Sequence, residues 1–366
     1  MITFTSNHLK YIWDCSANVL SKSNAVFCVV FTYSLDTFVI DEYQKLLKCP
    51  LHVIYGSPKH TKDVLFQQRN THFYYGSVDR GSMHAKLIML FCEKHILVIV
   101  STANFGAQKR SQNVFYHCVG TISRSSTHAS TRSSTHTPPF KQDLMQFCRE
   151  LPSHILKSLN NSLTEEFDIL FPDVIKNYKF DIPNTIHLIW TSPKRKSSMS
   201  MIKSYSLPTT ELLTLQPTSL GRRLDKRFWN KIITSFLHNG ETNKKRTTEI
   251  RVVVPRHALT PFQLQRANIP SHIQTMIESL KWKNKKLNYN GFDHTIYDNL
   301  ANVPHFKLYY GSNKNQTKID YLFFSSMSFS RGACGIDTSK NTELGVLYIP
   351  TTETSKKKLA SLIPIT

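Results

Sequence analysis

Two short His-x-Lys motifs are the residues of this sequence best suited to chemistry. His84 and Lys86 precede the apolar run LIMLFC, and His305 and Lys307 lie in the similar stretch HFKLYYGS. Residues i and i+2 of a strand project to the same face, so each His should point with its Lys into one cleft. A single pair would carry little weight. Two pairs in matching contexts, each followed by a hydroxyl-rich segment (STAN at 101–104 and SSMS at 325–328), favour a functional site.

This combination of side chains suits attack on a phosphodiester. The negative oxygens of the phosphate repel nucleophiles, and lysines neutralise them as charge develops in the transition state. One neutral imidazole can attack phosphorus and form a covalent phosphohistidine, while a protonated imidazole donates a proton to the leaving oxygen. We find no spacing of His, Cys and carboxylates typical of metal ligands, and therefore expect neither a metal nor another cofactor.

The charge of the chain points to an anionic partner. The 366 residues carry a formal net charge of +21, with 46 Lys and Arg against 25 Asp and Glu. Nucleic acid is the first candidate partner and an anionic membrane surface the second. The seven cysteines are scattered and form no Cys-x-x-Cys pair, which favours a reducing compartment over a disulfide framework. No signal peptide or long apolar run is evident, so we expect a soluble protein without a membrane association.

Strand and helix signals alternate along the chain, which predicts an α/β fold. We expect two domains, 1–190 and 191–366, each with one His-x-Lys motif, because the second half repeats the first in outline. The Ser/Thr-rich stretch 123–139 contains Arg-Ser-Ser-Thr-His twice and predicts a mobile surface loop. The expected strands are 25–34, 51–57, 71–77, the hairpin near 87–101, 186–193, 249–255, 305–312, 321–326 and 343–350; the expected helices are 36–48, 138–151, 154–166, 272–283 and one around Trp229.

The two half-sites resemble those of the phospholipase D superfamily, with one departure. Most members carry Asp five residues after the Lys, where this sequence has Phe91 and Ser312. An Asn after the following strand, without that Asp, is instead similar to the tyrosyl-DNA phosphodiesterase family. Four further stretches fit that family in order: FTYSLDTF (31–38), QPTSLG (216–221), SFSRGACG (328–335) and TELGVLYIP (342–350). The resemblance implies two similar phospholipase D-like domains, each a mixed β-sheet flanked by helices, related by a pseudo-two-fold axis with the active site between them.

The same resemblance implies roles for individual residues. His84 resembles the nucleophile and His305 the general acid/base, and Glu343 resembles the acid that orients the nucleophile. Gln112 resembles the amide that supports the second histidine, in an alignment that needs a deletion. The matched phosphate binders are Lys86, Lys307 and Asn104, and the matched DNA-backbone contacts are Thr218, Ser219, Ser330 and Arg331.

Two positions depart from the family pattern. Ser328 stands where the family has a second Asn, and its hydroxyl can still donate one hydrogen bond to a phosphate oxygen. Arg80 stands where an aromatic side chain stacks on a base, a task that a guanidinium plane can also perform. The basic runs 244–246 and 281–286 are typical of solvated faces or of DNA contacts, and the sequence does not separate the two.

We therefore expect a metal-independent phosphodiesterase of DNA repair. The resemblance implies DNA with a 3′ phosphotyrosyl or other blocked end as substrate, single- or double-stranded, a topoisomerase I-derived peptide as leaving group, a monomer, and a location in the nucleus with mitochondria as a second compartment. Two alternatives stay open. A phospholipase D-type nuclease or lipid phosphodiesterase would use the same motifs, and a catalytically weakened DNA-binding relative would explain Ser328.

Overall fold

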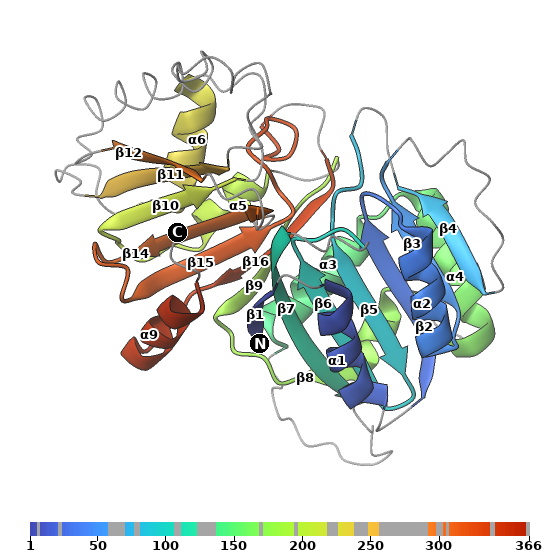
Figure 1. The fold of residues 1–366 in the computed structure, drawn as a ribbon. Helices are drawn as coiled ribbons and strands as arrows, with labels where there is room; N and C mark the ends of the chain where they lie inside the picture. The colour runs from blue at the N-terminus through green and yellow to red at the C-terminus, as the bar shows by residue number, and fades with distance from the viewer. Residues whose placement is uncertain are drawn as a thin grey trace.

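The computed structural model describes the two sheets and most of their helices (Figure 1). Four predicted features lie outside the described residues: most of the Ser/Thr-rich stretch, the helix at 272–283 and both basic runs. The described residues are 1–5, 8–20, 24–57, 70–76, 81–105, 111–122, 137–167, 171–193, 197–217, 226–237, 248–255, 292–297, 303–304, 307–336 and 341–363.

The first half forms a mixed sheet with the strand order β1-β7-β6-β5-β2-β3-β4. Strands β2, β3 and β4 run parallel, and the other neighbours on this path are antiparallel. Two short strands, β8 and β13, pair with β7 in addition. The elements are β1 (Ile2–Thr5), α1 (His8–Leu20), β2 (Ala25–Thr32), α2 (Thr37–Leu47), β3 (Leu51–Tyr55), β4 (Thr71–Tyr75), β5 (Leu87–Cys92), β6 (His95–Ser101), β7 (Ser111–Ile122), α3 (Pro139–Arg149), α4 (Ser153–Phe167), the 3-10 helix Asp173–Asn177 and β8 (Tyr178–Phe180).

The second sheet repeats the first. Its spatial order is β9-β16-β15-β14-β10-β11-β12. When the seven strands of each path are numbered along the chain, both sheets have the order 1-7-6-5-2-3-4, and each pair of neighbours has the same relative direction, parallel or antiparallel, in both. The prediction of a duplicated α/β unit is therefore confirmed. The elements are β9 (Ile186–Thr191), α5 (Ser198–Ser204), β10 (Leu212–Gln216), α6 (Lys226–Phe236), β11 (Glu249–Pro255), β12 (Phe292–Tyr297), β13 (Val303–Pro304), β14 (Lys307–Ser312), β15 (Ile319–Ser325), β16 (Glu343–Tyr348) and α9 (Glu353–Leu362).

Strand β9 belongs to the second sheet although it precedes most of the second half in sequence. It pairs with β16 along its whole length, from Ile186 opposite Tyr348 to Thr191 opposite Glu343. Helix α3 reaches it from the first half, where the Glu150 carboxylate that follows the helix accepts hydrogen bonds from Trp190 Nε1 (2.9 Å) and Ser192 Oγ (2.8 Å). The topology therefore starts the second repeat at β9, a few residues before the predicted boundary at 190/191.

Three clusters of buried apolar residues cover the faces of the two sheets. The largest is shared by the inner faces of both sheets and includes α3 (Phe140, Leu144) together with β16 (Leu344, Val346). A second cluster lies between α1, α2 and the outer face of the first sheet, and a third between α5, α6 and the outer face of the second sheet. Covering on both faces explains why strands such as β5, LIMLFC, are apolar throughout instead of alternating.

Helix α6 confirms the amphipathic pattern around Trp229. Phe228, Trp229, Ile232 and Ile233 are fully buried, and they recur at the spacing that places residues on one helix face. Among the described residues, no helix combines the length and the apolar character that crossing a membrane requires.

The shared core predicts a strong effect of Phe140 on stability. Phe140 is fully buried and its ring lies 5.3 Å from the Tyr116 ring of β7. Phe140→Ala should lower the free energy of unfolding by ~3–5 kcal/mol, because a buried cavity adds to the lost transfer energy. Phe38→Ala on α2 is the matched control, since that side chain is 61% exposed, and should change stability by less than ~0.5 kcal/mol. Denaturant unfolding curves measure both, and equal losses would contradict the shared core.

Candidate active site

The segment that carries His84 is fixed between the two halves. Met83 forms an isolated parallel bridge with Thr342, and the backbone N–H of His84 donates to the Thr342 carbonyl at 2.8 Å. Thr342 N–H in turn donates to Ser82 O at 3.0 Å. Gly56 makes this path possible, because a Cβ at that position would collide with the Met83 carbonyl oxygen. The first half therefore presents His84 directly to the strand of the second half that carries Glu343.

The ring of His84 faces a buried carboxylate from the other half. Nδ1 of His84 lies 3.6 Å from Oε1 of Glu343, whose side chain is 2% exposed. Asn341 Nδ2 donates to the same oxygen at 3.2 Å, and Ser326 Oγ donates to Oε2 at 2.5 Å. These bonds fix the carboxylate, so the Nδ1–H tautomer of His84 is favoured and the lone pair stays on Nε2.

His84 is open enough to meet a substrate. Its side chain is 29% exposed, and the Tyr33 ring packs against it with ring centroids 4.2 Å apart. Burial, followed by the nearby charges of Lys86 and Lys307, lowers the pKa of His84 to about 2. The imidazole is therefore neutral near pH 7, which is the form that a nucleophile requires.

Two buried lysines lie around this histidine. Lys86 is 3% exposed and Lys307 is 4% exposed. Lys86 Nζ donates to the His84 carbonyl at 2.7 Å. Burial lowers the pKa of Lys86 to about 8, an effect that Glu343 partly offsets, and burial with the charge of Lys86 lowers the pKa of Lys307 well below its ordinary value. Burial also raises the pKa of Glu343, against the pull of both lysines.

The balance of these charges favours an anion. Two lysines and one carboxylate leave a net positive charge in a site with little access to water, where electrostatic interactions are strong. A phosphate oxygen placed there would stabilise the protonated form of both lysines, because a nearby negative charge favours a cation. The arrangement can therefore bind a phosphodiester and neutralise the charge that grows on it when a nucleophile attacks phosphorus.

The two hydroxyl-rich segments form equivalent turns. Ser101 N–H donates to the Lys86 carbonyl at 3.0 Å, and Ser325 is the register partner of Lys307. In both turns the serine hydroxyl then accepts from the N–H two residues later, at 2.8 Å from Ala103 and 2.9 Å from Met327. Asn104 and Ser328 thus occupy corresponding positions of the two turns.

Asn104 has a polar atom suited to a ligand. Its Oδ1 is buried and has no hydrogen-bond partner among the described residues. Since the oxygen and nitrogen of an amide are assigned from their surroundings, a bound phosphate would select the orientation in which the amide N–H₂ donates to it.

Several predicted site residues lie outside the described part of the chain. His305, Arg80, Thr218 and Ser219 are among them, and Gln112 is described in its backbone alone. The flanks of His305 are described: Pro304 on β13 pairs with Gln112 on β7, and Lys307 opens β14. Ser330 and Arg331 lie in the partly exposed turn after β15, where Ser330 Oγ accepts from the Ala333 N–H at 3.1 Å.

The two positions that lack the usual Asp are built into the sheets. Phe91 is fully buried and stacks on Phe27 with ring centroids 4.1 Å apart, and Ser312 is fully buried at the end of β14. Phe91 in particular has no place for a carboxylate. Sequence reasoning missed Tyr33, Ser326 and Asn341. The first two lie in quoted motifs, and Asn341 stands two residues before Glu343, so proximity to the motifs is the signal that could have found them.

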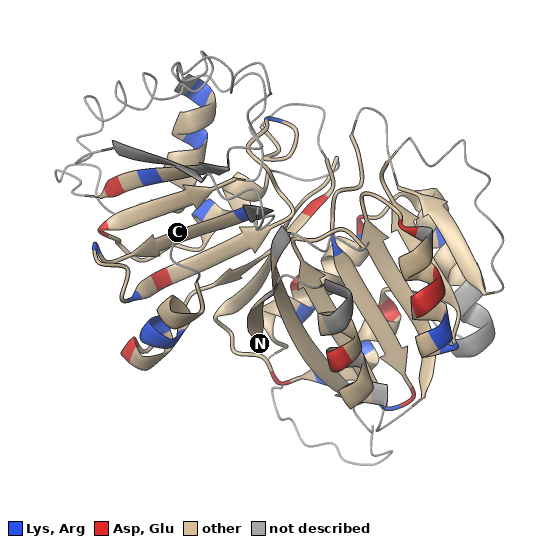
Figure 2. Cartoon of the chain, in the orientation of Figure 1, with Lys and Arg blue, Asp and Glu red and all other residues tan. Residues whose placement is uncertain are grey.

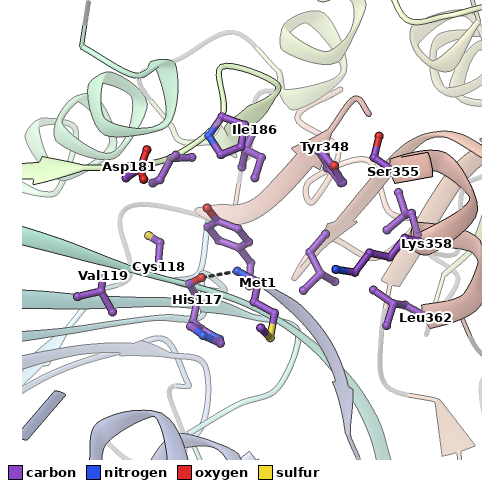
Figure 3. Close-up of a pocket in the computed structure, with 15 residues that line it drawn as sticks. Met1, His117, Cys118, Val119, Asp181, Ile186, Tyr348, Ser355, Lys358 and Leu362 are labelled. Carbon is purple, nitrogen blue, oxygen red and sulfur yellow. Dashed lines mark hydrogen bonds between the residues drawn. The ribbon is translucent and has the colours of Figure 1, made fainter. Parts of the chain in front are cut away.

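Other features of the described chain lie apart from these residues. Lys, Arg, Asp and Glu are distributed over both halves (Figure 2), and within the described ranges no group of three or more His, Cys, Asp and Glu could hold a metal ion. A pocket of about 470 Å³ opens between β7, α9 and the start of β9 (Figure 3), and none of its lining residues is a candidate site residue.

Comparisons with known proteins identify the family of this chain. The family model described as tyrosyl-DNA phosphodiesterase matches residues 16–362. A crystal structure of yeast tyrosyl-DNA phosphodiesterase is similar at a TM-score of 0.57 and 14% identity, covering 89% of this chain and 83% of that one. A mutant form of the yeast enzyme reaches a TM-score of 0.63 at 14% identity, covering 96% and 90%.

A second kind of enzyme shares the fold. Phosphatidylserine synthase of Haemophilus influenzae has a TM-score of 0.51 at 10% identity, covering 98% of this chain and 86% of that one. At such identities the structural likenesses speak for the fold, whereas the family model spans nearly the whole chain and includes both halves of the site. The chain therefore belongs to the tyrosyl-DNA phosphodiesterase family.

Proposed function

We propose that this protein hydrolyses the bond between a DNA 3′ phosphate and a tyrosine or another blocking group, through a covalent phosphohistidine and without a metal ion. The observation that carries the proposal is the neutral His84 beside two buried lysines, with its Nδ1 3.6 Å from the Glu343 carboxylate. Family membership supports the tyrosyl-DNA substrate, and the net charge of +21 supports a nucleic-acid partner.

The reaction has two steps. In the first, His84 Nε2 forms a bond to phosphorus, the bond from phosphorus to the tyrosyl oxygen breaks, and His305 gives its proton to the phenolate. In the second, His305 takes a proton from water, the water oxygen bonds to phosphorus, and the bond to His84 breaks. The products are free tyrosine, or its peptide, and a DNA 3′ phosphate.

The other side chains stabilise the charges of these steps. Lys86, Lys307 and Asn104 hold the phosphate oxygens, with Ser328 in the place corresponding to Asn104. Glu343 stabilises the positive charge that His84 acquires in the phosphohistidine. Thr218, Ser219, Ser330 and Arg331 would contact the DNA backbone, and Arg80 would stack on a base. A monomer acting in the nucleus is part of this proposal.

Trapping the intermediate tests the mechanism. A labelled single-stranded oligonucleotide ending in 3′ phosphotyrosine is incubated with the protein in EDTA. The native protein should release a 3′ phosphate, His305→Ala should accumulate a covalent protein–DNA adduct, and His84→Ala should give neither product. His95→Ala is the control, because His95 begins β6 at the end of the hairpin remote from the motif, and should behave as the native protein.

Four outcomes would contradict the proposal. An adduct formed by His84→Ala would refute the assignment of the nucleophile, and turnover lost in EDTA but restored by a divalent cation would refute metal independence. Hydrolysis of phospholipid in place of the oligonucleotide would favour a lipid phosphodiesterase. Tight binding without turnover would favour the non-catalytic relative.

The lysine burial predicts a pH dependence. The pKa of Lys86 is lowered to about 8, so the free protein loses this charge as the pH rises through that value and binds phosphate less well. Above pH ~8, kcat/KM should fall by about tenfold per pH unit, because this ratio reports the free enzyme. Lys86→Arg should lower kcat/KM but move the fall to higher pH, since arginine keeps its charge. Lys45→Arg, at a side chain that is 75% exposed, should leave the profile unchanged. A fall that stays in place in Lys86→Arg would contradict the prediction.

The departure at Ser328 predicts a gain of activity. Asn104 and Ser328 occupy corresponding turns, and an asparagine amide reaches farther than a serine hydroxyl. Ser328→Asn should raise kcat/KM by about tenfold, the effect of one hydrogen bond to a charged oxygen. Ser361→Asn on the exposed face of α9 is the control and should have no effect. A decrease in Ser328→Asn at unchanged thermal stability would show that this half-site is built around the hydroxyl.

A further inference from the structure

In each half, the residue directly before the histidine pairs with the backbone of the other half, and the two pairings are equivalent. Met83, directly before His84, pairs in parallel with Thr342, directly before Glu343. Pro304, directly before His305, pairs in parallel with Gln112, directly before Asn113. On this register the residue of the first half that corresponds to Glu343 is Asn113.

Neighbouring strands give the same correspondence. The edge strands β9 and β1 lie next to β16 and β7. Thr191 of β9 is the register partner of Glu343, and Thr5 of β1 is the register partner of Asn113. The first strands of the two repeats therefore meet β16 and β7 at matching positions.

Hydrogen bonds to the hydroxyl-rich turns agree with this register. Leu344 N–H donates to Ser326 Oγ and Val114 N–H donates to Thr102 Oγ1, each at 3.1 Å. Each donor follows one position after Glu343 or Asn113. The backbone N–H groups of Ser326 and Thr102 return bonds to the Leu344 and Val114 carbonyls at 2.9 and 3.1 Å.

The side-chain faces also correspond. Val114 and Leu344 belong to the shared inner core, and neighbouring residues of a strand project to opposite faces. Phe115 and Leu347 lie instead in the outer cores, on the same strand faces as Asn113 and Glu343 respectively. Asn113 is fully buried there, as Glu343 is at 1% exposure. A shift of one residue reverses the face, so Gln112 and Asn113 cannot both take the place of Glu343.

We propose that Asn113, in place of Gln112, is the positioning residue of the second histidine, His305. This rests on the proposed function of His305 as general acid and base. The two half-sites then differ in charge for a chemical reason. A carboxylate stabilises the cation that His84 becomes when it is phosphorylated, whereas a neutral amide orients His305 and lets it both give and accept a proton.

The titration of His305 tests this proposal without relying on turnover. In protein labelled at histidine with ¹⁵N, the His305 ring signals are identified by their loss in His305→Ala and followed against pH. Asn113→Asp should raise the pKa of His305 by about one unit or more, because a carboxylate favours the imidazolium. Gln112→Glu is the matched control and should leave that titration in place. The reverse pattern, or no shift in either variant, would overturn the proposal.

Kinetics supply a second readout in case a buried Asp prevents folding. Asn113→Ser removes the amide but adds no charge, and should slow turnover of 3′ phosphotyrosyl DNA while the covalent adduct accumulates. Asn315→Ser, at an exposed residue in the turn after β14, is the control and should turn over within about threefold of the native rate. Adduct accumulation in Gln112→Ala alone would overturn the proposal. Failure of the native protein to cleave this substrate would reject the proposed function, and the titration would still decide the role of Asn113.

Discussion

Burial of two lysines around one carboxylate is the interaction on which the site depends. Lys86 directly precedes β5 of the first sheet, whereas Lys307 and Glu343 begin β14 and β16 of the second, and all three are nearly inaccessible to water. Burying a cation costs free energy unless an anion compensates for it, and one carboxylate cannot compensate for two lysines. The lowered lysine pKa values express this deficit. A bound phosphate supplies the missing negative charge. The excess positive charge of the free protein is therefore compensated when a phosphodiester binds.

The duplicated fold explains how such a cluster is assembled. Strand β7 of the first sheet pairs with Pro304, directly before His305, and Thr342, directly before β16 of the second sheet, pairs with Met83, directly before His84. Neither half therefore contains a complete site, and the shared inner core fixes the distance between them. Placing the reacting groups by backbone pairing in two rigid sheets gives the preorganisation that electrostatic catalysis requires.

The sequence predicts much of this arrangement because its strongest signals are local. The His-x-Lys motifs, the apolar strands and the stripe on α6 follow from strand and helix periodicity, and the structure describes β5, β14 and α6 where they were expected. Glu343 came from the family resemblance, not from periodicity. Ser326 and Asn341 were missed because their role depends on where a turn and a loop place them, which spacing alone does not encode.

Register is the other limit of sequence reasoning. The choice between Gln112 and Asn113 depends on a deletion in the alignment, and a one-residue shift reverses which side chain faces the site. The pairing of Pro304 with Gln112 supplies the register that the sequence lacks. Short elements such as β1 and α5 were also missed, since ITFT and SMSMIKS are too short for a periodic pattern, and α5 begins instead at the Ser197 side chain that accepts from the Ser200 N–H.

The central claim is that the two halves form one anion site. A crystal structure of the full chain with tungstate, a stable oxyanion shaped like phosphate, tests it most directly. The account predicts a single tungstate beside His84, within hydrogen-bond distance of both Lys86 and Lys307 and of the Asn104 amide. A tungstate bound by the lysine of one half and out of reach of the other lysine would contradict it.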